Sequence, residues 1–185
     1  MRKSKIEWTE QTWNPSAGCT KISSGCKNCY AETMAIRLKG RGTVGYENGF
    51  KFNPVPSRLN DPLKRKKPTV YFVNSMSDIF HENMPDEYLD RIFEVVENTP
   101  HHTYQILTKR ADRMYDYFSK NPVPSNVWLG VTVENKQQGL PRIDKLRHLK
   151  AKVLFLSVEP LLEDLGMINL TNIDWVIVGG ESGNR

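Results

Sequence analysis

The sequence predicts an α/β fold in which parallel strands alternate with helices, as a partial (β/α)6 TIM-like barrel. Most of the six candidate strands are uninterrupted apolar runs, which is typical of parallel strands covered on both faces. The segments between them carry apolar residues at helical spacing. At 185 residues, the chain has the length of one ordinary domain with its own core. An open doubly wound sheet would fit the same alternation.

Each element follows from a local pattern. Strands are expected at 6–9, 69–74, 103–107, 126–133, 152–157 and 174–179. The first helix, 30–39, has an apolar stripe and stops at Gly40 and Gly42. The second, 86–97, follows Pro85 and begins with acidic residues, as many helices do. Further helices are expected over 111–119 and 141–149, with at most a short one over 159–165.

Residues 40–68 are the least regular part of the chain, with glycines in the first half and prolines at 54, 56, 62 and 68. A connection of this length in a compact domain usually forms a lid or a binding loop. A passive surface excursion is the alternative. We expect an irregular loop or lid within a single domain that covers residues 1–185.

The composition is that of a globular protein, with 38% apolar and 25% charged residues. No apolar run is long enough to span a bilayer, and none follows the basic start of the chain as in a signal peptide. We therefore expect a cytoplasmic protein without a membrane partner. The net charge of +5, part of which comes from the run Lys64–Lys67, permits a nucleic-acid partner. A solvated basic surface is the alternative.

All three cysteines, Cys19, Cys26 and Cys29, lie between the first predicted strand and the first helix. An odd number cannot pair completely within the chain, and the last two have the Cys-x-x-Cys spacing of metal ligands. Three local thiolates leave one coordination position of a metal centre open. A zinc site that adds His81, just past a predicted strand end, is one interpretation. A four-iron cluster with one iron exposed to a cofactor is the other.

Polar residues and glycines follow the other predicted strands where they end. The carboxyl ends of parallel strands share one edge, and ligands bind there in such folds. Ordinary turns and helix caps use the same residue types, so it is the set, together with the cysteine loop, that favours a functional site. The candidates are Ser77, Asp78, Lys109, Arg110, Glu134, Glu159, Gly179, Gly180 and Glu181.

The cysteine loop, with Tyr30 directly after its last cysteine, resembles that of the radical S-adenosylmethionine superfamily. A closer resemblance is to a phage- and bacteria-borne family with a three-cysteine motif and no settled activity. It rests on the segments WNPSAGC (13–19), GCKNCYA (25–31), SVEPL (157–161) and GGESG (179–183), and it covers nearly the whole chain. Two features depart from the pattern. Six residues rather than three separate the first two cysteines, and the chain stops after the sixth strand, where similar proteins continue, as in a truncated form.

In the superfamily, S-adenosylmethionine chelates the open iron of a [4Fe-4S] cluster and is cleaved to a radical that abstracts hydrogen from the substrate. The resemblance implies that the three cysteines hold the cluster. It places Asp78 as acceptor for the methionine amino group, within a stretch that lacks the superfamily's glycines. The implied cofactor site consists of Tyr30, Ser77, Asp78, Glu134, Glu159, Gly179 and Gly180. Lys109, Arg110 and Glu181 are candidates for substrate binding, and no hydrogen-donating residue is identified.

Three functions fit these observations. The first is a radical enzyme with an unknown substrate and an electron donor of the flavodoxin or ferredoxin type. The second is a zinc-stabilised nucleic-acid-binding module, which the basic net charge favours. The third is a catalytically inactive relative of phage origin that is kept for partner binding. A phage-encoded protein would work in the cytoplasm of the bacterial host.

Overall fold

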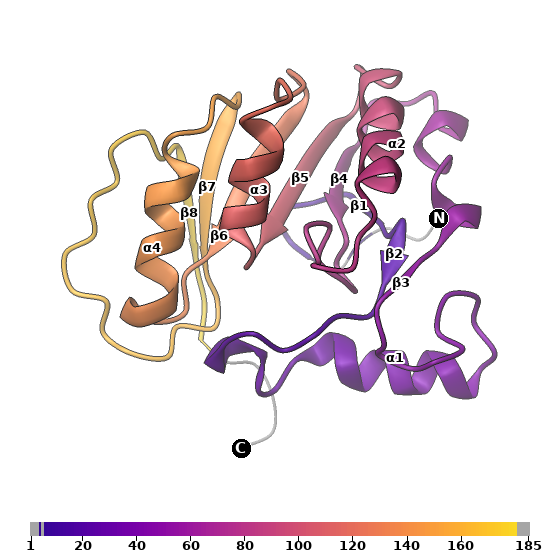
Figure 1. Ribbon diagram of the computed structural model, residues 1–185, viewed down its shortest axis with the longest axis horizontal. Helices are drawn as coiled ribbons and strands as arrows, with labels where there is room; N and C mark the ends of the chain where they lie inside the picture. The colour runs from indigo at the N-terminus through magenta and orange to yellow at the C-terminus, as the bar shows by residue number, and fades with distance from the viewer. Residues whose placement is uncertain (1–3, 5, 181–185) are drawn as a thin grey trace.

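The computed structural model of the protein describes residue 4 and residues 6–180. Within them, six strands form one parallel sheet in the order β1-β4-β5-β6-β7-β8, which is also their order along the chain (Figure 1). The predicted α/β fold with six parallel strands is therefore confirmed. The strands are β1 (Gln11–Trp13), β4 (Val70–Val73), β5 (Thr103–Thr108), β6 (Val127–Thr132), β7 (Val153–Val158) and β8 (Trp175–Val178).

Three helices connect successive strands and lie side by side on one face of the sheet (Figure 1). They are α2 (Asp86–Glu97), α3 (Ala111–Phe118) and α4 (Lys136–Leu146). In the described residues the sheet does not close, because β1 pairs only with β4 and β8 only with β7. An unclosed parallel sheet with helices on one face is a partial barrel, as predicted.

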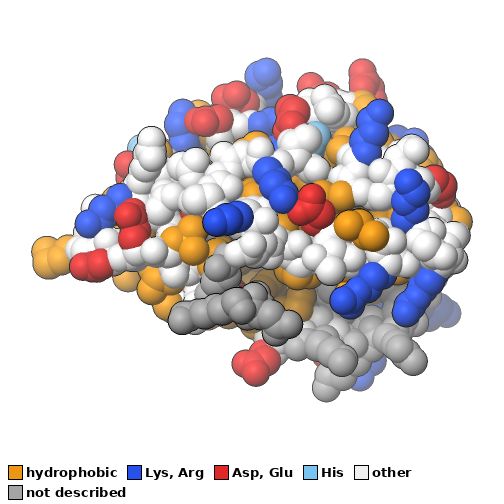
Figure 2. Space-filling model, turned by 90° about the horizontal axis from the view of Figure 1, so that it is seen from below, with side chains coloured by type: hydrophobic (Ala, Val, Ile, Leu, Met, Phe, Trp, Pro, Cys, Tyr) orange, Lys and Arg blue, Asp and Glu red, His pale blue; other side chains and the backbone are white. Residues whose placement is uncertain are grey.

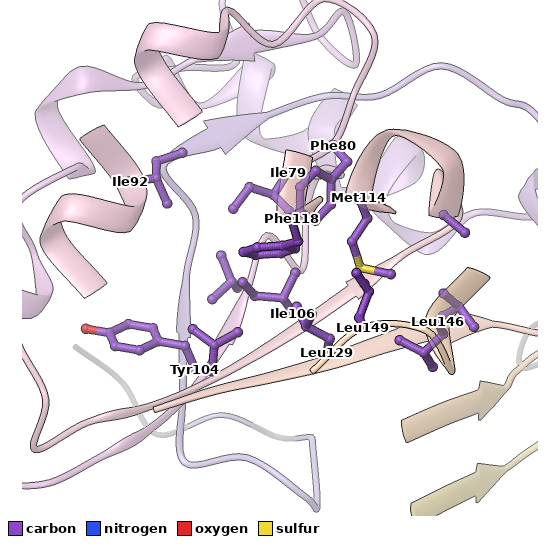
Figure 3. Packing of buried hydrophobic residues seen from close by; sticks show 14 of the residues in the cluster. Ile79, Phe80, Ile92, Tyr104, Ile106, Met114, Phe118, Leu129, Leu146 and Leu149 are labelled. Atoms are coloured by element: carbon purple, nitrogen blue, oxygen red, sulfur yellow. The ribbon is translucent and has the colours of Figure 1, made fainter. Parts of the chain in front are cut away.

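The main core lies between the sheet and these helices (Figure 3). Ile92 of α2, Met114 of α3 and Leu146 of α4 are fully buried, and Ile106 and Leu129 face them from β5 and β6. The apolar positions of α2 predicted from periodicity are all buried. In the described part of the chain, no helix is both long and apolar enough to cross a membrane.

Three elements differ from the prediction. The first strand spans 11–13 rather than 6–9, because pairing with β4 buries Trp13, whose indole N–H donates to the Arg58 carbonyl at 2.9 Å. The fourth helix begins at 136, since Asn135 Oδ1 caps it by accepting from the Gln138 N–H, and Pro141 lies inside it. The stretch 159–165 forms no helix. Its N–H groups at 161 and 162 instead bond to the carbonyls of residues 179 and 134.

Helix α1 (Tyr30–Gly40) lies apart from the other helices, across the edge of the sheet where the strands end (Figure 1). It buries only Ala31 and Ala35, in a small core with Tyr46 and Val55. Residues 40–68 thus support α1, and their role as a lid stays a prediction. Short elements complete this region: β2 (Ser16–Ala17), β3 (Asn53–Pro54) and the 3-10 turns η1 (Ser24–Cys26), η2 (Pro56–Arg58) and η3 (Pro62–Lys64).

Gly130 of β6 is a position where the core leaves no room for a side chain. A Cβ there would lie 2.5 Å from the ring of Phe155 on β7. We predict that Gly130→Ala lowers the free energy of unfolding by about 1–3 kcal/mol through overpacking. The matched control is Gly40→Ala at the end of α1, where a Cβ meets nothing within 4 Å, and it should be neutral or stabilising. Urea unfolding measures both, and equal effects would contradict this packing.

Candidate site at the carboxyl edge of the sheet

The cysteine loop is fixed at its start to the segment that follows β4. The Gly18 N–H donates to the Met76 carbonyl at 3.1 Å, and Ser77 Oγ donates to the Gly18 carbonyl at 2.7 Å. Gly18 has a φ of +73°, and a Cβ there would lie 2.2 Å from the Lys51 carbonyl oxygen. Only glycine fits such a position. Cys19, the next residue, is therefore held at the carboxyl edge of the sheet.

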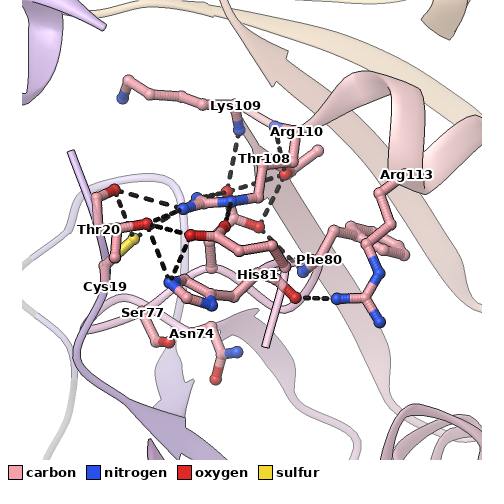
Figure 4. Close-up of polar contacts among 12 residues, drawn as sticks. Cys19, Thr20, Asn74, Ser77, Phe80, His81, Thr108, Lys109, Arg110 and Arg113 are labelled. Atoms are coloured by element: carbon pink, nitrogen blue, oxygen red, sulfur yellow. Dashed lines mark hydrogen bonds and ion pairs between the residues drawn. The ribbon is translucent and has the colours of Figure 1, made fainter. Parts of the chain in front are cut away.

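Arg110 contacts the first cysteine from the end of β5 (Figure 4). Its Nη1 donates to Cys19 Sγ at 3.5 Å, and its Nη2 donates to Thr20 Oγ1 at 2.8 Å. The same guanidinium pairs with Asp78 at 3.2 Å and with Glu82 at 2.8 Å, and the side chain is only 9% exposed. Arg110 thus joins the loops after β4 and β5 to the cysteine loop.

Asp78 is buried, and the protein's own donors occupy both of its carboxylate oxygens. Oδ1 accepts hydrogen bonds from the Phe80 N–H at 3.0 Å and from Thr108 Oγ1 at 2.7 Å. Oδ2 accepts from the Lys109 N–H at 3.1 Å and from Arg110. Asp78 is therefore the fixed counter-charge of Arg110, and in this structure neither oxygen is open to a ligand's amino group.

His81 packs beneath Thr20, with its ring stacked on Phe52 at a centroid distance of 4.1 Å. Nδ1 accepts from the Asn83 N–H, and Nε2 lies 3.1 Å from Thr20 Oγ1. Burial, and then the positive charge of Arg110, lower the pKa of His81, so its ring is neutral near pH 7. Because both ring nitrogens have partners, His81 is not poised to be the fourth ligand of a zinc ion.

The thiols differ in their electrostatic surroundings. Burial raises the pKa of Cys19 to about 11, although the Arg110 charge acts in the opposite direction. At Cys26, burial is outweighed by hydrogen bonds from the preceding residues and by the charge of Lys109, and the pKa is lowered. Since metals bind thiolates, the two cationic side chains favour the metal-bound form of the loop.

Cys19, Cys26 and Cys29 are all free and half-buried. Among the described residues, no three His, Cys, Asp or Glu side chains gather around the position of a single metal ion. A four-iron cluster makes a different demand, because each thiolate binds a different iron and the sulfurs surround the cluster. Three thiols of one loop, with cationic side chains beside them, fit that donor set better than they fit a Cys3His zinc site.

Glu134, two residues past the end of β6, is fully buried beside the second half of the cysteine loop. Its Oε2 pairs with Arg142 of α4 at 2.6 Å, whereas Oε1 has no hydrogen-bond partner within the described residues. A Cβ on Gly25 would lie 3.1 Å from Glu134 Cγ. The absence of a side chain at Gly25 therefore lets the cysteine loop lie close to Glu134. The neighbouring Asn135 donates to Ser24 Oγ at 2.8 Å. One buried acceptor oxygen is thus left unpaired beside the cysteine loop.

The other predicted residues that the structure describes lie along the same edge. Glu159 and Gly179 touch at the ends of β7 and β8, where a Cβ on the glycine would lie 2.3 Å from Glu159 Oε1. A Cβ on Gly180 would meet open space, and Glu181 lies outside the described residues. Tyr30 is 58% exposed, and its hydroxyl donates to a carbonyl of the loop after β4.

Sequence reasoning missed four residues that build this site: Thr20, Gly25, Glu82 and Arg142. Hydrogen bonds from Thr20 and Arg110 lower the pKa of Glu82 to about 2, although burial opposes this, and the carboxylate is ionised. Arg142 lies inside the helix predicted over 141–149, but as a charged residue it does not belong to the apolar pattern that predicts the helix. In the structure it is among the buried residues of α4. An arginine in an otherwise apolar stripe indicates a buried acidic partner.

Removing Arg110 would leave the buried Asp78 carboxylate without its counter-charge. We predict that Arg110→Ala lowers the free energy of unfolding by about 3–5 kcal/mol, the range for breaking a buried ion pair. Lys145→Ala, which breaks an exposed pair with Asp112, is the control and should change it by about 1 kcal/mol or less. Urea unfolding measures both variants. If Arg110→Ala changed the free energy of unfolding no more than the control, Arg110 would not be needed to connect the loops after β4 and β5 to the cysteine loop.

Three solved chains of spore photoproduct lyase are similar to this chain in fold. A double mutant with bound AdoMet and dinucleoside spore photoproduct aligns with a TM-score of 0.57 and 14% identity, over 95% of this chain and 58% of that one. A complex with the dinucleoside gives 0.56 and 14%, over 85% and 47%. This chain therefore spans about half of their length, and the similarity shows the fold alone.

No curated protein matches the chain. The match to a family is extensive, because it covers residues 3–185. The chain therefore belongs to the family described as "Protein of unknown function (DUF5131)".

Proposed function

We propose that this protein is a radical S-adenosylmethionine enzyme whose cysteine loop holds a [4Fe-4S] cluster. The observation that carries the proposal is the position of the loop. It lies at the carboxyl edge of a six-stranded partial barrel, held by the loops that follow β4, β5 and β6. Ligands of such folds bind at this edge. The fold shared with spore photoproduct lyase supports the same conclusion.

Cys19, Cys26 and Cys29 would hold the cluster, which when bound supplies an electron to S-adenosylmethionine and so starts radical chemistry. This chain's contribution is to orient the loop and to compensate its charge. Arg110 donates to the first thiol, and the charge of Lys109 acts on the second. An electron donor of the flavodoxin or ferredoxin type and a cytoplasmic location belong to this proposal.

Glu134 is the side chain best suited to bind S-adenosylmethionine. Its unpaired Oε1 can accept a hydrogen bond from the amino group or a ribose hydroxyl, at no loss of the Arg142 ion pair. Glu159 would accept a second hydrogen bond, and Gly179 and Gly180 would let the backbone approach the adenine. Tyr30, Ser77 and Asp78 would line the cofactor site on the side of β4. Asp78 would contribute by positioning Arg110, with which it is paired.

The substrate site is less defined. Arg110 is already paired with two carboxylates, which leaves Lys109 as the cation best placed to hold a substrate carboxylate or phosphate. Glu181 stays a candidate. The lyase structures contain a dinucleoside photoproduct, but they are considerably longer than this chain, so that substrate is not transferred to it.

We predict that protein reconstituted without oxygen is brown and binds about four irons per chain. Alanine at any one of the three cysteines should abolish most of the iron binding and the visible absorption. Ile22→Ala, at an exposed position of the same loop, is the control and should retain both. Colourless protein that holds only zinc would reject the proposal. Iron-loaded protein that forms no 5′-deoxyadenosine after reduction with S-adenosylmethionine would indicate an inactive relative instead.

We also predict that Glu134→Gln weakens S-adenosylmethionine binding about tenfold, because a charge-assisted hydrogen bond is lost. Its iron content should stay that of the wild type, since Glu134 is not a ligand. Glu94→Gln, at an exposed position of α2, is the matched control. Equilibrium dialysis with labelled S-adenosylmethionine measures the affinity. Unchanged binding in iron-loaded Glu134→Gln would remove this residue from the cofactor site.

A further inference from the structure

Helix α1 and its flanking segments form a basic surface over the carboxyl edge. Residues 19–51 contain six lysines and arginines but only two glutamates. Five of the six are exposed and form no ion pair within the described residues. They are Lys27, Arg37, Lys39, Arg41 and Lys51, here called the α1 basic surface. Figure 2 shows the molecule from this side, with blue side chains spread over the face and red ones also present among them.

Helix stability explains only part of this charge. Arg37 and Lys39 lie in the last turn of α1, where cations interact favourably with the helix dipole. Lys27 precedes the helix, and Lys51 lies well beyond its end, so the dipole accounts for neither. Like charges without ion-pair partners on one segment repel each other, and a bound polyanion would relieve that repulsion.

We infer that the α1 basic surface binds the phosphate backbone of a nucleic acid. Lys27 lies between Cys26 and Cys29, so the surface begins inside the cysteine loop and continues along α1 to the segment that holds it. A strand bound there would pass beside the proposed cofactor site. The inference deepens the proposed function by naming its substrate class, although the binding itself requires no cluster.

A nucleic acid fits this surface better than a membrane does. A helix that lies in a membrane interface presents one wide apolar face. On α1 the exposed apolar residues are Tyr30, Met34 and Ile36, and exposed Arg37 and Lys39 belong to the same helix. The exposed part of α1 is therefore mixed and not one apolar face. Contacts with a phosphate backbone require cationic side chains but no continuous apolar face. The exposed ring of Tyr30 also offers a surface on which a base can stack.

The test compares two triple variants of the iron-free chain of 185 residues. Arg37→Ala/Lys39→Ala/Arg41→Ala removes three positive charges from the α1 basic surface. Lys64→Ala/Lys66→Ala/Lys67→Ala removes three exposed charges before β4, at the opposite edge of the sheet. Fluorescence anisotropy measures binding to short single-stranded and duplex DNA and RNA at several salt concentrations. Circular dichroism shows whether both variants retain the wild-type helix content.

The first variant should bind about tenfold more weakly than the wild type, and the slope of log K against log salt should fall by about one per lost phosphate contact. The control should bind like the wild type. Equal losses in both variants, a loss only in the control, or no wild-type binding at low salt would overturn the inference. Binding to phosphatidylserine vesicles in place of the oligonucleotides would also overturn it. None of these results depends on iron binding, so the inference and the proposed function can fail separately.

Discussion

The buried ion pair between Asp78 and Arg110 is the interaction on which the geometry of the candidate site depends. Asp78 follows β4 and Arg110 follows β5, and these strands are parallel neighbours, so the pair forms where both end. Two charges are costly to bury unless hydrogen bonds satisfy their remaining atoms. Here Thr108 and backbone N–H groups saturate the carboxylate, while the rest of the guanidinium reaches Cys19 and Thr20. The first cysteine is thus positioned by the sheet and not only by its own loop.

A second buried pair, between Glu134 and Arg142, lies beside the other half of the loop, and it differs in one respect. The first pair uses all of its acceptor oxygens, whereas Glu134 keeps Oε1 unpaired beside Gly25. An unpaired buried acceptor is destabilising unless a ligand or water supplies a donor. The two pairs therefore differ in what they leave unpaired. The pair at β4 and β5 contacts the cysteine loop and is saturated, whereas the pair at β6 keeps one buried acceptor oxygen without a partner in the described residues.

The fold could be predicted from the sequence because hydrophobic periodicity is local. The bounds of α2 were predicted to the residue, and the polar residues after each strand were expected at one edge. The first strand was misplaced because Gln11 and Thr12 look unlike a buried strand. Gln11 and Trp13 are buried through pairing with β4, which is 60 residues away in the register. The pairings of the site depend in the same way on distant residues, so the sequence identified Asp78 and Arg110 but not that they bind each other.

The position of α1 connects the irregular segment to the site. A helix that buries only two alanines gains little free energy from apolar burial, so its own packing does little to fix its position relative to the sheet. Residues 40–68 supply what it lacks, since Tyr46 and Val55 cover those alanines and the Phe50 carbonyl accepts from the Cys19 N–H at 3.0 Å. The length of this segment therefore has a structural reason. Because α1 buries only Ala31 and Ala35, most of its other side chains are exposed, and these include both cations and apolar residues.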